Sequence, residues 1–253
     1  MQMNADALFE EAGFIKEYRS EFETFYRPFF EDGNALKDFF ASVFENDSLD
    51  KKPRRMMNHI VWFVSLANDI DKIRPGRDPL RILFLRFCLE SICKTVGSNP
   101  RTFFDTFDSY FSEEGKQYIL SHFVFSGIMV PEELNWMDRA LFDTHEDYCL
   151  TCGDFLKIIR ATRNMVAHDG DYWSMQFFAR DADSKWITTM TTNEELITCQ
   201  LNGKELTYCF HTSMQYDRFV YYFVEACLNY LKSYIDTQRE TSGAVDYRGN
   251  DNG

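Results

Sequence analysis

The chain has 253 residues, 45% of them hydrophobic and 26% charged, which is the composition of an ordinary globular protein with a well-buried core. No stretch approaches the roughly 20 apolar residues that a membrane helix needs, and residues 1–11 carry acids where a signal peptide carries bases. Seven scattered cysteines favour free thiols over a disulfide framework. We therefore expect a soluble, cytoplasmic protein that does not span a membrane.

The charge is unevenly distributed along the chain. The net charge of −13 argues against nucleic-acid binding, which draws on Lys and Arg to neutralise phosphates. Between Lys51 and Arg101, however, eleven bases stand against four acids, an excess of seven positive charges, so the remainder of the chain carries −20. This basic stretch is either an ordinary solvated face or a local electropositive surface for RNA phosphates.

Hydrophobic periodicity predicts helices along most of the chain. In chain order they span about 5–30, 35–44, 54–73, 78–96, 100–125, 145–168 and 215–235. Pro100 fits the first turn of the fifth helix, which we expect to be broken along its length, and 127–131 is a predicted loop. The pattern becomes helical again from Glu132 onward.

The periodicity changes between Tyr172 and His211, where Thr, Trp, Tyr, Phe and Ile are frequent. Asn202-Gly203 separates two runs in this segment, and such a dipeptide between alternating runs is a strong hairpin signal. We predict a small antiparallel sheet inserted before the last helix.

The predicted fold class is mainly α. A helical extension spans 1–48, and a polar stretch separates it from a helical domain at 49–240. The β insertion lies within that domain at about 172–212. The composition of 241–253 predicts a disordered tail.

The motif that most clearly indicates a chemical function is Arg163-Asn164-Met165-Val166-Ala167-His168, at the end of the predicted helix 145–168. An arginine, a polar residue directly after it and a histidine five positions on, at a helix end in a helical body, resemble the signature of the HEPN superfamily of ribonucleases and toxins. The resemblance covers about residues 54–236. It implies a HEPN-like helical bundle that dimerises, so that two motifs form a metal-independent RNA-cleaving centre. It also implies catalytic roles for Arg163, Asn164 and His168, with neither a cofactor nor a metal.

These residue types suit RNA cleavage without a metal. An imidazole titrates near neutral pH and can accept or donate a proton, and a guanidinium stays charged and presents a planar fork to phosphate oxygens. In a regular α-helix, with about 100° per residue, Arg163 lies some 140° from His168. One motif therefore does not easily direct both groups at one phosphate, whereas two chains can pool them. This geometry also favours a homodimer.

Each motif residue has an ordinary structural interpretation as well. A histidine before Asp-Gly complements the carbonyl end of a helix, Arg163 fits a solvated side chain, and Asn164 fits a capping group. Glu90 falls on the apolar side of the helix 78–96, and a buried carboxylate needs a partner. In HEPN bundles an acidic residue of an earlier helix approaches the motif arginine, which makes Glu90 a further candidate catalytic residue. An ordinary acid on a helix surface explains Glu90 equally well.

Packing explains the other histidines and cysteines. His145, Cys149 and Cys152 share a helix face, but no fourth ligand is evident, which favours small buried thiols over a metal site. His59 and His122 stand in aromatic-rich helical runs and are expected to be satisfied core or boundary residues.

Two functions from different classes follow. The first is a homodimeric endoribonuclease, a toxin or antiphage effector with an RNA substrate and an antitoxin or activating partner. HEPN toxins silenced by a nucleotidyltransferase carry a tyrosine two positions after the histidine, whereas this chain has Gly170, which argues against that control. The second is a non-catalytic HEPN-like module that binds a nucleotide or a protein. A helical structural protein unrelated to the family is a third interpretation.

Overall fold

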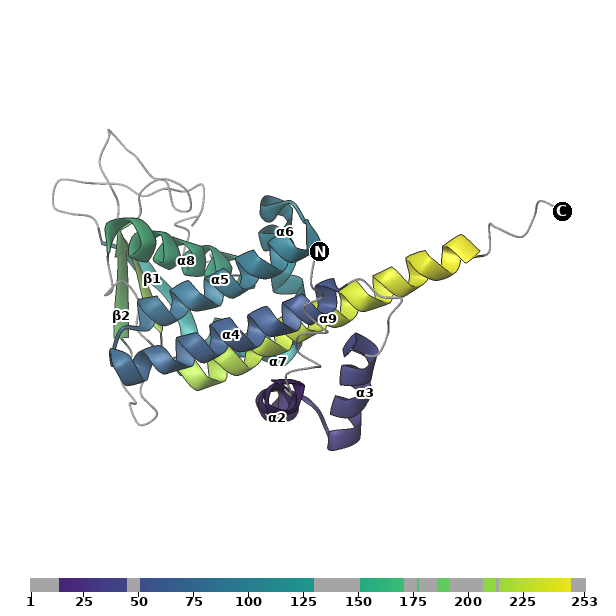
Figure 1. Ribbon diagram of the computed structural model, residues 1–253. Coiled ribbons are helices and arrows are strands. Elements are labelled where there is room, and N and C mark those ends of the chain that lie inside the picture. Colours follow the sequence, from purple (N-terminus) through teal and green to yellow (C-terminus); the bar gives the residue numbers. More distant parts are fainter. Residues whose placement is uncertain are drawn as a thin grey trace.

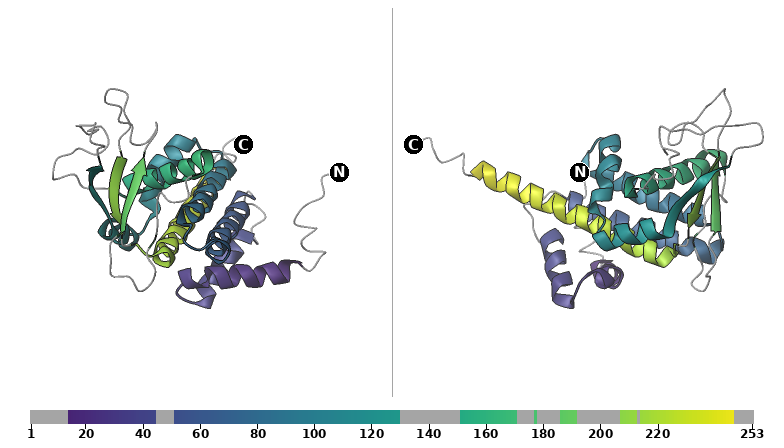
Figure 2. Two further views of the ribbon diagram at one scale, coloured as in Figure 1. Left: turned by 90° about the vertical axis from the view of Figure 1, so that its left-hand side faces the viewer. Right: turned by 180° about the vertical axis from the view of Figure 1, so that it is seen from behind.

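The computed structural model describes residues 14–44, 51–129, 151–170, 177, 186–191, 207–212 and 214–246. This part of the chain is mainly helical, as the sequence predicts, and its long helices lie side by side in a bundle (Figure 1). A small sheet stands at one end of the bundle, and the last helix projects beyond the other end (Figure 2). None of the helices described combines the length and the apolarity that crossing a membrane requires.

Two antiparallel helices form the centre of the bundle, α4 (Lys52–Ile73) and α5 (Asp78–Val96). Both agree with the predicted ranges to within two residues because their ends carry strong local signals. Pro53 and Pro79 occupy the first turns, where a missing backbone N–H is harmless. Gly97 ends α5 with a φ of 74°, the left-handed conformation that favours glycine. Helices from both the N-terminal and the C-terminal parts of the chain pack on this pair.

Three short helical segments and a strand follow α5. They are α6 (Pro100–Thr106), η2 (Phe107–Tyr110), α7 (Glu113–His122) and β1 (Phe123–Met129). Asn99 caps α6, since its Oδ1 accepts the N–H of Thr102 at 3.3 Å. The helix predicted as far as Phe125 and the loop predicted from Gly127 are both wrong, because β1 occupies these positions. Phe, Val and Ile suit a strand as well as a helix, so periodicity over so few residues does not separate the two.

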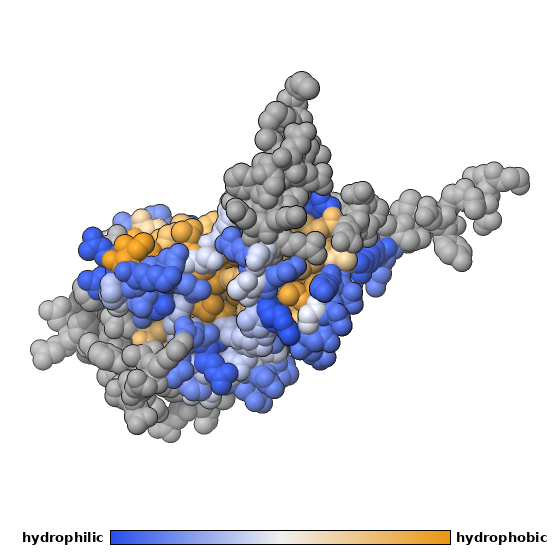
Figure 3. Space-filling view, turned by 60° about the horizontal axis from the view of Figure 1, so that its bottom comes forward, coloured by the Kyte–Doolittle hydropathy of each residue, from blue (hydrophilic) through white to orange (hydrophobic). Residues whose placement is uncertain are grey.

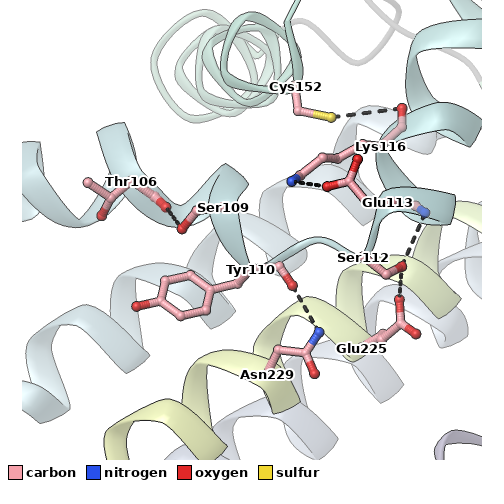
Figure 4. A network of polar contacts seen from close by, with 10 residues as sticks. Thr106, Ser109, Tyr110, Ser112, Glu113, Lys116, Cys152, Glu225 and Asn229 are labelled. Atoms are coloured by element: carbon pink, nitrogen blue, oxygen red, sulfur yellow. Dashed lines mark hydrogen bonds and ion pairs between the residues drawn. The ribbon is translucent and has the colours of Figure 1, made fainter. Parts of the chain in front are cut away.

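A polar network fastens this region to the last helix, α9 (Tyr216–Asp246), as Figure 4 shows. The hydroxyl of Ser112 donates to Oε2 of Glu225 at 2.5 Å. The side-chain amide of Asn229 donates to the carbonyl of Tyr110 at 3.0 Å. These contacts link residues more than 100 positions apart in sequence, and they hold η2 and the start of α7 against α9.

Helix α8 (Cys152–Asn164) packs against α5 and carries the first part of the motif. It begins seven residues after the predicted start at His145, and Thr151 explains why. The Thr151 Oγ1 accepts the N–H of Asp154 at 3.1 Å, and Oδ2 of Asp154 accepts the N–H of Thr151 at 2.9 Å. This reciprocal pair is a capping box, which marks the first turn of a helix.

The sheet contains β1, β2 (Trp186–Thr191) and β3 (Thr207–Thr212). All pairings are antiparallel, and β3 lies between the other two strands. β2 and β3 come from the segment with the predicted insertion, whereas β1 comes from before α8. The predicted Asn202-Gly203 turn lies outside the described residues.

Phe177 links the segment after α8 to the bundle. Its N–H donates to Oδ2 of Asp78 at 2.7 Å, and its ring stacks on Phe219 with the ring centroids 5.5 Å apart. Asp78 is buried, and its other oxygen accepts from Arg81 at 3.0 Å. Burial raises the pKa of this carboxyl, and the bonds from Phe177 and Arg81 oppose that shift.

Helix α9 is longer than predicted. Periodicity placed its end at about Ile235 and a disordered tail from residue 241, but α9 continues to Asp246. The end prediction is wrong because the residues after Ile235 are polar and leave no apolar pattern to follow. The packed part of α9 supplies the nucleus, and adding further turns to an existing helix needs little additional stabilisation. Residues 247–253 lie outside the described part.

The N-terminal helices form a layer below the bundle in Figure 1. They are α2 (Phe14–Tyr26), the short η1 (Arg27–Phe29) and α3 (Gly33–Phe44), and residues 1–13 lie outside the described part. Tyr26 is fully buried, and its hydroxyl donates to the carbonyl of Met57 in α4 at 2.8 Å. Phe29 stacks on Tyr221 of α9 with the centroids 5.0 Å apart. The extension is therefore packed onto the helical domain through aromatic rings.

We expect Tyr26→Ala to lower the free energy of unfolding by about 3–5 kcal/mol, because it empties a large buried site. Tyr26→Phe keeps the ring and removes one buried hydrogen bond, so a loss of about 1 kcal/mol is expected. Urea unfolding followed by far-UV circular dichroism measures both. If Tyr26→Ala unfolds at the same urea concentration as the wild type, the extension does not pack as described.

Some large apolar side chains remain at the surface, and Figure 3 shows apolar patches among hydrophilic ones. Trp62, Leu66 and Ile73 of α4 are exposed by 55%, 46% and 70%. They are spaced by four and seven residues, so they form a stripe on the outer side of α4.

Candidate functional site: a basic groove beside the Arg-His motif

The motif spans a change of helix type. Helix α8 ends at Asn164, and Met165–Asp169 form a π-helical segment, η3, before Gly170 adopts a φ of 66°. The prediction of a regular α-helix as far as His168 is therefore wrong. A π-helix bonds residue i to residue i+5, which brings residues five apart closer in angle than an α-helix does. The angle of about 140° between Arg163 and His168, which holds for a regular α-helix, therefore does not apply here. This angle no longer implies that two chains are needed to direct both groups at one phosphate.

Arg163 is held in place on two sides. Its Nη2 donates to Oε2 of Glu90 at 3.2 Å, and its Nη1 donates to Oδ1 of Asn164 at 3.0 Å. The side chain is 24% exposed, and its Nε is buried without a hydrogen-bond partner among the described residues. The interpretation of Arg163 as a freely solvated side chain is therefore wrong. Asn164 orients the neighbouring guanidinium instead of capping the helix with its side-chain oxygen.

Glu90 makes the contact with Arg163 that the family resemblance suggests, and it also binds a second arginine. Its Oε1 accepts from Nε of Arg86 at 3.2 Å, so one carboxylate bridges two guanidinium groups. The side chain of Glu90 is 34% exposed, which leaves it accessible from outside the bundle. The bridge fixes Arg163 of α8 relative to α5.

Arg86 is unusual because its charged side chain is only 6% exposed. Its Cζ lies 3.3 Å from the centre of the Phe104 ring, a close cation–π contact. Burial lowers the pKa of Arg86 to about 10; Glu90 opposes this effect, and the charges of Arg160 and Arg163 add to it. This pKa still lies well above neutral pH, so Arg86 remains a cation and three guanidinium groups share the vicinity of one carboxylate.

We expect Glu90→Gln to destabilise the fold by about 2 kcal/mol, because it leaves the buried Arg86 without a carboxylate. A fully buried pair would lose more, but Glu90 is partly solvated. The matched control is Asp105→Asn, which neutralises an exposed acid 4.0 Å from Arg101 and is expected to change stability by less than about 0.5 kcal/mol. Urea unfolding compares the two. Equal effects would mean that the bridge contributes nothing.

The bridge forms part of the wall of an open groove between α5, α6 and α8. The groove has a volume of about 1040 Å³. Its charged lining consists of six basic side chains, Arg86, Lys94, Arg101, Lys157, Arg160 and Arg163, and two acidic ones, Glu90 and Asp105. The groove thus has an excess of four positive charges in a protein with a net charge of −13. Such a concentration of cations attracts polyanions despite the overall charge.

Sequence reasoning found only part of this groove. Lys94 and Arg101 belong to the basic stretch from Lys51 to Arg101, but nothing in the sequence distinguished them from the other bases there. The three bases of α8, Lys157, Arg160 and Arg163, were missed as a set. Their spacing of three residues places them on one side of a helix, and this spacing was the available signal.

His168 lies on the π-helical segment with an exposed side chain. It is not part of the Glu90 bridge, and the groove lining contains Arg163 but not His168. His168 follows Arg163 by five residues in the sequence. Its side chain is exposed, whereas that of Arg86 is buried.

The other candidate residues lie away from the groove or outside the described part. Cys152 is buried, and burial raises the pKa of its thiol to about 11, while His145 and Cys149 lie outside the described residues. Nδ1 of His122 bonds the carbonyl of Tyr118 at 2.8 Å, as expected for a satisfied boundary residue. His59 differs, because its Nδ1 is buried without a partner among the described residues, and burial lowers its pKa.

No cluster of three or more His, Cys, Asp or Glu side chains suited to a metal ion occurs within the residues that the structure describes. Comparisons with protein-family models, with curated proteins and with solved structures find no match to this chain.

Proposed function

We propose that the protein is a metal-independent endoribonuclease of HEPN type, a toxin or antiphage effector. The observation that carries the proposal is the Arg163 guanidinium held by Glu90 and Asn164 at the edge of a basic groove, with an exposed histidine five residues away. The resemblance of the Arg163–His168 motif to the HEPN signature supplies the reaction, and the groove supports an RNA substrate.

The chemistry requires three groups at one phosphate. A base removes the proton of the ribose 2′-hydroxyl, and the 2′-oxygen attacks phosphorus to form a phosphorane. The bond from phosphorus to the 5′-oxygen then breaks, an acid protonates that oxygen, and a 2′,3′-cyclic phosphate remains. His168 serves as a proton-transfer group, and Arg163 neutralises the charge that develops on the phosphorane oxygens. Asn164 and Glu90 position Arg163.

The proposal includes a homodimer. The resemblance implies that two motifs meet, so each site takes Arg163 from one chain and His168 from the other. A two-fold axis relates the two sites of the dimer. A second copy of the chain therefore completes the site.

Wild-type protein incubated with mixed cellular RNA in EDTA tests this function. The expected result is RNA fragments that end in 2′,3′-cyclic phosphate and carry a 5′-hydroxyl. Cleavage that requires added Mg²⁺ and leaves a 5′-phosphate would contradict the proposal, because a metal-activated water would then be the nucleophile.

The second candidate is a non-catalytic module that binds a nucleotide or a protein. The two ion pairs of Glu90 favour this candidate. They join Arg86 of α5 and Arg163 of α8, so they also have a structural role in the packing of α5 on α8. In this case the protein would not cut RNA.

A further inference from the structure

The groove holds cations that the proposed reaction does not use. Cleavage needs Arg163 at the scissile phosphate, whereas Lys94 lies in the last turn of α5 and Arg101 at the start of α6. Arg86 is kept charged at a buried position, which carries a desolvation cost that an ordinary solvated face avoids.

The cations are spread out along the groove. Arg86 and Lys94 are eight helical residues apart, a rise of about 12 Å, and Lys157 and Arg163 are six apart, a rise of about 9 Å. This spacing suits phosphates that follow one another along a strand better than the compact phosphates of a single nucleotide. The volume of about 1040 Å³ also exceeds what one mononucleotide fills.

We propose that the groove between α5, α6 and α8 is a binding site for the sugar-phosphate backbone of single-stranded RNA, and that it leads the strand to Arg163. The inference rests on the proposed function for the direction of the strand, but binding itself needs no catalysis. Recognition through phosphates is independent of base sequence, because the charged lining neutralises backbone charge and releases counterions.

The experiment measures binding separately from cleavage. A fluorescein-labelled 2′-O-methyl oligonucleotide lacks the attacking hydroxyl, so it cannot be cut, and fluorescence anisotropy reports its affinity for the full-length protein. The test variant is Lys94→Glu/Arg101→Glu, which changes two exposed residues of the groove. The matched control is Lys72→Glu/Arg74→Glu, which makes the same charge change at the exposed α4–α5 turn, outside the groove. Circular dichroism verifies that both variants fold.

The groove variant is expected to bind at least about 10-fold more weakly than the wild type, and the slope of log affinity against log salt is expected to fall by about one to two. The control variant is expected to bind within about two-fold of the wild type. Equal weakening in both variants would overturn the inference, because net charge alone would then govern binding.

A single nucleoside triphosphate tested in the same assay separates strand binding from nucleotide binding. If ATP binds to the groove and the oligonucleotide does not, the strand proposal is wrong. If the oligonucleotide binds through the groove and cellular RNA is not cleaved, this inference stands and the proposed ribonuclease function fails.

Discussion

Arg163→Ala is expected to slow RNA cleavage by about 10²–10³-fold at saturating protein, because the charge on the phosphorane then lacks its guanidinium partner. Arg163→Lys restores the positive charge but not the planar fork that bonds Glu90 and Asn164 together, so we expect it to recover only part of the rate. Single-turnover cleavage of a labelled RNA oligonucleotide in EDTA measures both rates.

The control for Arg163 is Arg74→Ala, which removes an exposed arginine from the α4–α5 turn and is expected to leave the rate unchanged. The fold should survive Arg163→Ala, since Glu90 then remains paired with Arg86. A variant that cleaves RNA as fast as the wild type would exclude Arg163 from catalysis. A fall in rate that parallels a fall in the free energy of unfolding would indicate a structural role.

The second large effect concerns the proposed dimer. Homodimers of Arg163→Ala chains and of His168→Ala chains are each expected to cleave at least about 10²-fold more slowly than the wild type, but a heterodimer of the two should recover about half of the wild-type rate. Each site draws its arginine from one chain and its histidine from the other. One of the two sites is then intact, and the other has lost both groups.

The heterodimer is obtained by co-expression of the two chains with different affinity tags and two successive purifications. The control is a heterodimer of two His168→Ala chains carrying the same tags, which should be inactive. A mixed heterodimer as inactive as its parents would mean that Arg163 and His168 act from the same chain. A protein that is monomeric at assay concentration and still cleaves RNA would contradict the dimer itself.

The sequence predicted the central helices well because their ends carry local signals. Pro79 and Gly97 delimit α5, and the predicted range agrees with the observed one. The capping box of Thr151 and Asp154 was also readable, but the predicted helix began earlier, at about His145. Local chemistry at a helix end was a better guide than periodicity there.

The site was harder to predict than the helices. The contact between Glu90 and Arg163 was anticipated from the resemblance, yet Arg86 on the other carboxylate oxygen was not, because burial of an arginine depends on tertiary packing. The π-helical segment has no known local signal in Met165–Asp169, so the geometry of the motif could not be derived in advance.

The groove was also hard to predict, because tertiary packing assembles it from separate parts of the sequence. Its bases come from α5, α6 and α8, which are up to 77 positions apart in sequence, from Arg86 to Arg163. A net charge of −13 conceals this concentration of cations, because all but two of the 40 acids lie outside the groove lining. Only the packing of α8 on α5 brings the two basic sets together.

The most direct test of the central claim compares wild type and His168→Ala on the same RNA in EDTA, at matched fold and oligomeric state. His122→Ala serves as the control, since it removes a histidine of α7 that does not line the groove. We expect cleavage to cyclic-phosphate ends by the wild type and by His122→Ala, and a rate lower by about 10²–10⁴-fold for His168→Ala. Equal rates for wild type and His168→Ala would contradict the assignment of RNA cleavage to this motif.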